Sequence, residues 1–245
     1  MLLNTRAGLF LLGLVSISGW ASTPGIGSGI VYPTLNHANV VNPAALGENQ
    51  STNVQGLYGL GAKNIFGSAV IGLRSLGIGL DYTQLNAGGS EEHFGLGTKF
   101  GKIMLGGSVS TVEFSAFDFG AGLSIDMNST RFSLTAAGLK GGPDRMAFGL
   151  GTTLGSGGIE ADVSKAMASG SSDLDFNIGL HSRMHGLLFG IGYLFTKSSG
   201  GFVDRGFWAG FSVALSGSFA LEAYYKAGGT ILQLGTWSAG LQAEF

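Results

Sequence analysis

Residues 231–245 read ILQLGTWSAGLQAEF, and the second half of this stretch decides the fold. From Trp237 to Phe245 the odd positions are apolar, while the even positions are small or polar. A period of two is the pattern of a β-strand with one apolar face and one polar face. A strand at the end of a chain is either an exposed sheet edge or the partner that closes a barrel. Repetition of this pattern along the chain would therefore favour closure.

The composition excludes several classes of protein. Only 11% of the 245 residues are charged, 45 are Gly, and the formal net charge is −2, so no basic excess indicates a nucleic-acid partner. The chain has no Cys, which excludes disulfides and thiolate metal sites. The large apolar residues are spread along the sequence, because after residue 21 no long apolar run occurs.

The first 21 residues have the pattern of a secretory signal peptide. Arg6 supplies the positive region, residues 7–15 form an apolar core, and residues 19–21 are suited to cleavage. The apolar core is far shorter than the ~20 residues that a membrane-spanning helix needs. We therefore expect residues 1–21 to be removed on export and the mature chain to begin near Ser22.

Residues 22–52 differ from the rest of the chain because they show no sustained period of two. Pro and Asn interrupt the segment, yet it is too apolar for a simple linker. Asn42 followed by Pro43 predicts a short helical start with Pro at its first position. We expect this segment to form a plug at the periplasmic side of a barrel formed by residues 53–245.

Fourteen segments with alternating polarity follow, most of them about 8 to 11 residues long, a length that suits tilted transmembrane strands. Their polar faces carry Gly, Ser and Thr more than Lys or Glu, which favours a membrane barrel over a soluble sandwich. The predicted segments are 55–62, 65–74, 76–83, 93–100, 103–112, 117–127, 131–139, 145–154, 159–166, 173–183, 186–196, 206–215, 218–226 and 231–245.

The predicted connections alternate between short and longer, more polar ones, such as the turn at Gly101 against residues 197–205. Short periplasmic turns opposite longer outer loops, with an even strand number, are typical of an outer-membrane barrel of a Gram-negative bacterium. Aromatic residues near strand ends agree with interfacial girdles, namely Tyr82, Phe100, Phe117, Phe195, Phe207, Tyr225 and Phe245. The fold class expected is thus all-β, a closed antiparallel transmembrane barrel of about fourteen strands.

If the apolar faces contact lipid, the opposite faces define the interior. Fourteen strands enclose more space than side chains alone fill, and Gly leaves further room, so either water or the plug occupies it. Phe66 and Val70 are apolar residues that we place on the inner face. The charged residues predicted to face the lumen are Asp81, Asp118, Asp126, Arg131, Arg145, Glu160, Asp173, Asp175, Arg183 and Glu222.

The chain resembles the FadL-type family of outer-membrane transporters of hydrophobic compounds. The resemblance rests on the signal peptide, the motif Asn42-Pro43-Ala44-Ala45-Leu46 before the first strand, fourteen apparent strands and the terminal Phe245. It implies a periplasmic-side hatch and passive uptake of fatty acids or other apolar small molecules through the wall. This chain is shorter and lacks the long outer loops of larger members.

On this hypothesis apolar ligands enter between hatch and wall, and we expect Asn42, Pro43, Phe66 and Val70 to lie along their path. The other predicted partners are membrane lipid and, through the strand that ends in Phe245, the outer-membrane assembly machinery. No cofactor or nucleic acid is expected.

Two other functions remain open at this point. Inward charges suit a plain ion or solute channel, or a structural barrel without transport. An outer-membrane enzyme is the third alternative, but His181 and Ser182 are neighbours and point to opposite faces of a strand. The four His residues also show no metal-ligand spacing. We therefore expect neither an enzyme nor a metal protein.

Overall fold

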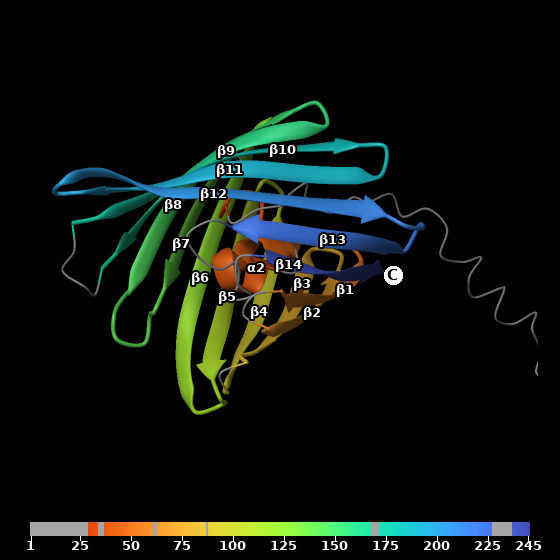
Figure 1. The fold of residues 1–245 in the computed structure, drawn as a ribbon, viewed down its shortest axis with the longest axis horizontal. Helices are drawn as coiled ribbons and strands as arrows, with labels where there is room; N and C mark the ends of the chain where they lie inside the picture. The colour runs from red at the N-terminus through yellow and green to blue at the C-terminus, as the bar shows by residue number, and fades with distance from the viewer. Residues whose placement is uncertain (1–28, 34–36, 61–62, 87, 168–171, 227–236) are drawn as a thin grey trace, which may run out of the picture.

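The computed structural model describes residues 29–33, 37–60, 63–86, 88–167, 172–226 and 237–245. Within these ranges fourteen antiparallel strands form a closed barrel, in which β1 pairs with β14 (Figure 1). The predicted fold class is confirmed. The predicted signal peptide, residues 1–21, lies outside the described residues and stays a prediction.

The strands follow one another around the barrel in chain order. Their bounds are β1 (Thr52–Gly59), β2 (Ile65–Leu73), β3 (Leu76–Gln84), β4 (Ser90–Phe100), β5 (Ile103–Val112), β6 (Ala116–Met127), β7 (Thr130–Ala137), β8 (Arg145–Leu154), β9 (Gly157–Ala166), β10 (Leu174–Met184), β11 (Leu187–Ser198), β12 (Gly201–Ala214), β13 (Phe219–Lys226) and β14 (Trp237–Glu244).

The predicted polar loop over residues 197–205 is wrong. Strands β11 and β12 continue through it, and only residues 199 and 200 connect them. The charged residues there indicated a loop, but a register shift at Leu194 and Phe195 keeps both strands paired. Asp173, expected to begin a strand, precedes β10, which starts at Leu174. Residues 231–236 lie outside the described residues.

The outer surface of the barrel is a belt of large apolar side chains. Leu134 in the middle of β7 is 42% exposed, and Leu241 of β14 is 54% exposed. Monomeric soluble proteins rarely expose apolar surface on this scale, whereas a transmembrane barrel places it against lipid. In the described part of the chain, no helix has the length and apolar character needed to cross a membrane.

The two ends of the barrel differ. We call one the turn end: here residues 74–75, 101–102, 128–129, 155–156 and 185–186 connect consecutive strands, β1 starts and β14 finishes. We call the other the loop end, where the β7–β8 connection spans residues 138–144. The β5–β6 connection at this end has only three residues, 113–115, so the predicted alternation in length is only partly present.

The described residues before β1 pack against the inner side of the wall. We call residues 29–33 and 37–51 the inner segment; it contains α2 (Ala38–Val41) and the 3-10 helix η2 (Pro43–Glu48) (Figure 1). The predicted helical start is confirmed: Pro43 opens η2, and the Asn42 side chain accepts a hydrogen bond from the Ala44 N–H. Residues 43–47 of η2 are buried.

Inward-facing glycines form the seat of η2. A Cβ placed on Gly97 would lie 2.5 Å from the Pro43 carbonyl oxygen and 2.7 Å from the Leu46 Cβ. The sequence predicted that these glycines would leave space in the lumen. Water and the plug were the two occupants left open, and the backbone and side chains of the inner segment lie in that space. The glycines of this seat on β3 to β6 are Gly77, Gly79, Gly95, Gly97, Gly106 and Gly122.

We expect Gly97→Ala to lower the free energy of unfolding by about 1–3 kcal/mol, because the added methyl overpacks the contact with η2. Gly67→Ala is the matched control, since Gly67 of β2 has nothing within 4 Å of its would-be Cβ. We expect that variant to be unchanged or stabilised by up to about 1 kcal/mol. Urea unfolding in detergent, followed by heat-modifiable mobility on a gel, measures both. Equal changes in unfolding free energy for the two variants would contradict the close contact between η2 and the glycine seat.

Candidate functional site

A cavity of about 660 Å³ opens above the inner segment on the loop-end side. Its floor comes from the inner segment and is mostly apolar, with Ile30, Val40, Val41 and Pro43 beside the polar Asn39. Its walls carry charges of both signs, through Asp118, Arg145, Asp162, Asp175, Arg205 and Lys226. We call it the loop-end cavity.

A second cavity of about 640 Å³ lies on the turn-end side. Tyr32, Gly47, Glu48 and Gln50 of the inner segment line it, together with wall residues Arg74, Ser75, Lys99, Gly101, Arg131 and Thr153. We call it the turn-end cavity. Among the described residues, none lines both cavities, and the inner segment contributes to the lining of each.

The barrier between the two cavities is thin beside β8. Ile30 lines the loop-end cavity and Tyr32 lines the turn-end cavity, so only Val31 lies between them along the chain. On β8 of the wall, Ala147 lines the loop-end cavity and Thr153 lines the turn-end cavity. Val31, with no exposed surface, closes the space between these wall residues.

Two glycines of β8 receive the Val31 side chain. The would-be Cβ of Gly149 lies 2.6 Å from Val31 Cγ2, and that of Gly151 lies 2.7 Å from Val31 Cγ1. Ile30 and Asp162 also contact the Gly149 position, and Tyr32 also contacts the Gly151 position, so Val31 and its two neighbours together pack against this glycine-lined strand.

Carboxylates of β9 fix the backbone on either side of Val31. The Tyr32 N–H donates to Glu160 Oε2 at 3.1 Å, and the Ile30 N–H donates to Asp162 Oδ2 at 3.1 Å. These acidic side chains satisfy backbone donors that no strand partner reaches, which a buried segment requires.

The Asp162 carboxylate is itself held by a chain of side chains in the lumen. Asn177 Nδ2 donates to Asp162 Oδ2 at 2.9 Å, and Trp208 Nε1 donates to Asn177 Oδ1 at 2.7 Å. Trp208 is only 1% exposed and fills the interior beside Gly179 and Gly192. On the side opposite the glycine seat, side chains of the wall therefore fill the lumen.

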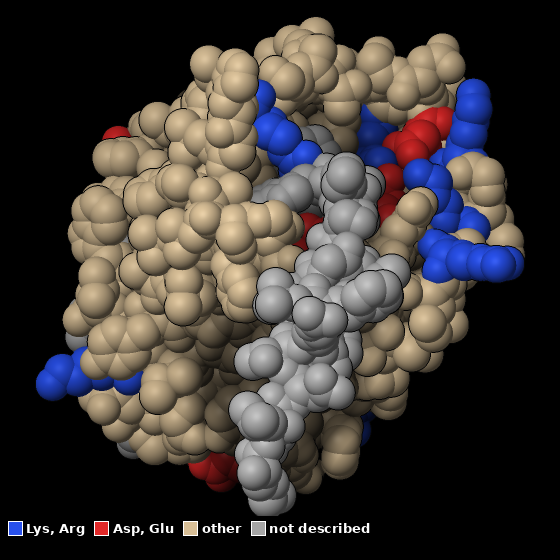
Figure 2. Space-filling view, turned by 90° about the vertical axis from the view of Figure 1, so that its right-hand side faces the viewer, with Lys and Arg blue, Asp and Glu red and all other residues tan. Residues whose placement is uncertain are grey.

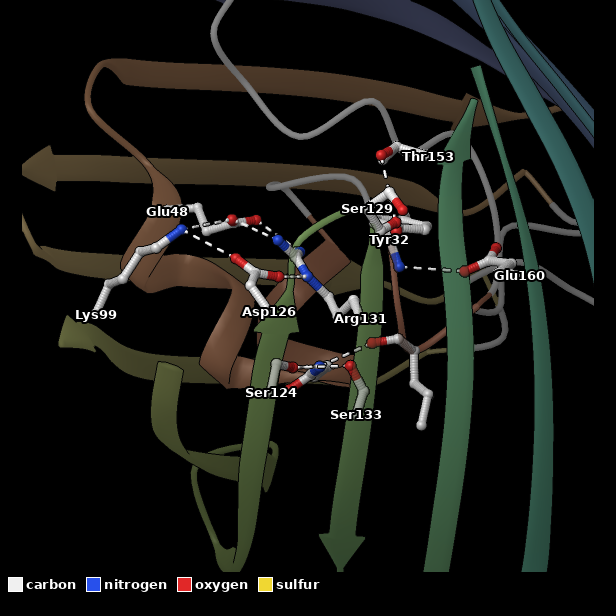
Figure 3. A network of polar contacts seen from close by, with 12 residues as sticks. Tyr32, Glu48, Lys99, Ser124, Asp126, Ser129, Arg131, Ser133, Thr153 and Glu160 are labelled. Carbon is white, nitrogen blue, oxygen red and sulfur yellow. Dashed lines mark hydrogen bonds and ion pairs between the residues drawn. The ribbon is translucent and has the colours of Figure 1, made fainter. Parts of the chain in front are cut away.

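An ionic network holds the end of η2 at the turn end (Figure 3). Arg131 donates from Nη1 and Nη2 to the two oxygens of Glu48 at 2.7 and 2.6 Å, and from Nε to Asp126 at 2.7 Å. Lys99 contacts Glu48 at 3.1 Å and Asp126 at 3.3 Å. Two cations and two carboxylates therefore balance, and the bidentate geometry fixes Glu48 on the wall.

Tyr32 packs on this network. Its ring lies 5.2 Å from the Arg131 guanidinium carbon and meets the His181 ring edge-on at 5.1 Å. Burial raises the pKa of Tyr32 to about 12, although the positive charge of Arg131 opposes the shift. The phenol is therefore neutral at physiological pH.

Four buried carboxylates around the inner segment make no ion pair with any Lys or Arg of the described residues. They are Asp81, Glu160, Asp162 and Glu222. Gln55 donates to Glu222, while backbone and amide groups serve Glu160 and Asp162. The inner segment contains no Lys or Arg. The wall around it is consequently acidic.

Of the four residues predicted for the ligand path, Pro43 alone lines the loop-end or the turn-end cavity. Pro43 lines the loop-end cavity. Asn42 is fully buried and donates to the Ile30 carbonyl oxygen at 2.7 Å and to Ser124 Oγ at 3.0 Å. Phe66 and Val70 face inward as predicted, but each packs in a buried apolar cluster. Their role in a ligand path stays a prediction.

The remaining predicted lumen residues are divided between the two ends. At the loop end, Asp118 lines the cavity, and Arg145 and Asp175 form an exposed ion pair at 3.7 Å. Asp173 lies in the connection before β10, and Arg183 lies near the turn end of that strand. No group of three or more metal-ligating side chains occurs in the described part of the chain.

Sequence reasoning missed Val31, Tyr32, Glu48 and Trp208. Trp208 and Ser212 lie an even number of residues apart on β12 and are both buried. The alternation along this strand therefore indicated that Trp208 points into the lumen. The other three precede the first strand, where no periodicity relates a residue to the wall.

His37 is a buried titratable residue of the inner segment, and its protonation should make the folded protein sensitive to acid. Its ring is 2% exposed and packs against Phe66 at 5.6 Å and Tyr224 at 5.7 Å between ring centroids. Burial lowers the pKa of His37 to about 4. Its neutral form therefore stabilises the fold fully above pH ~6.5, and this contribution is lost as the pH falls toward 4.

We expect the stability difference between the natural chain and His37→Phe to change by about 3 kcal/mol between pH 7.5 and pH 4. Phe preserves the ring contacts and cannot be protonated, so the variant should resist acid better. Urea unfolding at a series of pH values measures this change. If both proteins lose the same stability over that range, His37 is not the acid-sensitive group.

No model of a known protein family matches the sequence, and no curated protein shows significant sequence similarity to it. The fold is similar to that of a solved CymD monoaromatic hydrocarbon channel, with a TM-score of 0.61, 10% identity, and coverage of 94% of this chain and 99% of that one. It is also similar to the Acinetobacter baumannii outer membrane protein Omp33, with a TM-score of 0.55, 8% identity, and coverage of 80% and 96%. At these identities the likeness establishes a barrel fold shared with outer-membrane proteins, and the FadL-type resemblance stays a prediction.

Proposed function

We propose that this protein is an outer-membrane barrel that passes small apolar molecules by passive diffusion when the inner segment shifts. The short stretch of residues 30–32 carries the proposal, because its first residue lines one cavity, its last lines the other, and the buried Val31 lies between them beside β8. In this account the inner segment is the hatch predicted from the sequence. The turn end faces the periplasm, and the apolar belt faces lipid.

The two contacts of the inner segment suit different roles. Residues 43–47 meet Gly77, Gly97 and Gly106 through backbone atoms, a close contact that leaves little freedom for partial movement. Val31 meets β8 through a side chain alone. We infer that η2 stays on its seat, while residues 30–32 move away from β8 to join the cavities.

The apolar substrate class is supported by the surfaces along this route. Ile30, Val31 and Ala147 line or close it, and Val40, Val41 and Pro43 form the floor of the loop-end cavity. A volume of about 660 Å³ suits a small molecule. The CymD monoaromatic hydrocarbon channel has a similar fold, which is compatible with an apolar cargo for this protein.

A plain channel is the second candidate, favoured by the four buried carboxylates without cationic partners. If the inner segment left the lumen, this acidic wall would attract cations and repel anions. If the inner segment never moved, the barrel would conduct few ions. The two functions therefore differ in their cargo and in whether ions pass.

A disulfide between Val31→Cys and Gly149→Cys tests the movement directly. The chain has no natural Cys, so this bridge would be the only one. We expect oxidised cells carrying the pair to lose uptake of labelled monoaromatic hydrocarbon and labelled long-chain fatty acid, and reductant to restore it. The reason is that the bridge fixes the barrier on β8.

Each single-Cys variant is the control and should keep its uptake under the same oxidant. Full uptake through the bridged protein would contradict the proposal. Reversal potentials in planar bilayers separate the second candidate: a steady cation current without apolar uptake would support the channel instead.

A further inference from the structure

Two neighbouring hairpin turns at the turn end carry unpaired cations. Arg74 lies in the β2–β3 turn and Lys102 in the β4–β5 turn, and both are exposed. Neither makes a side-chain hydrogen bond or ion pair within the described residues. Every Asp and Glu of the chain belongs to those residues, so no carboxylate elsewhere in the sequence is left to pair with them.

The charge of these turns has a single sign. None of the connections 74–75, 101–102, 128–129, 155–156, 185–186 and 215–218 contains Asp or Glu. The nearby carboxylates Glu48 and Asp126 are taken by Arg131 and Lys99. Connections at the loop end, by contrast, contain acidic residues such as Glu113 and Asp144. Positive charge is therefore in excess at one side of the turn-end rim.

Large apolar side chains flank each cation on the lipid side. Leu73 and Leu76, which bracket the first turn, are 54% and 38% exposed. Phe100 and Ile103, which bracket the second, are 65% and 44% exposed. This pattern places the apolar side chains in the hydrocarbon and the cations at the level of lipid headgroups.

The two turns are neighbours on the rim. The Lys99 N–H at the end of β4 donates to the Ser75 carbonyl oxygen at 2.8 Å, which ties the first turn to the second hairpin. Hairpins two strand spacings apart place Arg74 and Lys102 about 10 Å from each other. Figure 2, which faces the turn end, shows Lys and Arg side chains projecting from one side of the rim beside Asp and Glu.

We propose that Arg74 and Lys102 together bind the headgroup of an anionic phospholipid in the leaflet at the turn end. The phosphate lies between the two turns, and the acyl chains lie along Leu73, Leu76, Phe100 and Ile103. The flanking apolar residues favour a lipid over a soluble acidic protein, which would leave them in water. Arg74 also lines the turn-end cavity, so the bound headgroup lies at the mouth of that cavity.

This inference depends on the proposed membrane placement but not on transport. Reconstitution in nanodiscs with equal parts of phosphatidylglycerol and phosphatidylethanolamine, followed by native mass spectrometry of the released protein, counts the retained lipids. We expect the natural chain to retain phosphatidylglycerol preferentially. The double variant Arg74→Gln/Lys102→Gln should lower that preference roughly tenfold, because each basic residue contributes severalfold to anionic-lipid binding.

Two further variants separate this site from general charge and from misfolding. Lys63→Gln/Lys140→Gln removes the same charge at the loop end and should keep the preference. Arg74→Lys/Lys102→Arg keeps both charges and should keep it as well. Equal phosphatidylglycerol retention by the natural chain and Arg74→Gln/Lys102→Gln overturns the proposal, as does equal loss in the loop-end control.

Added inorganic phosphate distinguishes the source of the anion. Unchanged lipid retention in excess phosphate supports a lipid site, whereas displacement of phosphatidylglycerol by phosphate indicates a site for free anions and overturns the assignment. A protein that keeps the lipid preference but fails in uptake contradicts the transport proposal alone. A protein that enters no bilayer contradicts the membrane placement on which both depend.

Discussion

The close approach of the η2 backbone to glycines on four consecutive strands is the constraint on which the rest of the structure depends. Side chains at Gly77, Gly97 or Gly106 would occupy the volume that residues 43–47 now fill. Because protein interiors tolerate little overlap, the wall and the inner segment must be built for each other. The position of η2 then fixes Asn42, Glu48 and, through the Asn42 bond to Ile30, the residues beside β8.

The polar contacts of the lumen follow from that arrangement. A buried segment without regular strand pairing needs other partners for its backbone donors, and Glu160 and Asp162 supply them from alternate positions of β9. Charge is balanced within the ionic network at the end of η2, where Arg131 and Lys99 meet Glu48 and Asp126. Deeper in the lumen the carboxylates lack cations, which gives the space around the segment its acidic character.

The strands and their inner faces could be predicted because a period of two is a local property of the sequence. Trp237 and Leu241 face outward and Ser238 and Glu244 face inward, as the alternation at the end of the chain indicated. The strand extension through residues 197–205 was missed, because charged residues at a strand end look like a loop when its partner strand is unknown. The pairing of β11 with β12 places most of these residues in strands.

The candidate site was less predictable for a physical reason. The inward glycines were recognised, but the occupant of the space they leave is set by contacts between residues far apart in sequence. Val31 faces Gly149 and Gly151 across more than a hundred residues, and nothing in its local sequence indicates that contact. Asn42 was identified as a helix cap, while its bond to Ser124 depends on the folded barrel.

The most direct test of the account is the reactivity of a single cysteine at Ala45, which is 1% exposed and packs in a buried cluster with Leu46 and Val70. Proteoliposomes carrying Ala45→Cys are treated with a membrane-impermeant maleimide from either side, and Ser115→Cys at the loop end serves as the exposed reference. The account predicts that the Ala45→Cys thiol reacts only after unfolding, while the reference reacts at once. Labelling of both at similar rates in the folded protein would show that the inner segment does not fill the lumen.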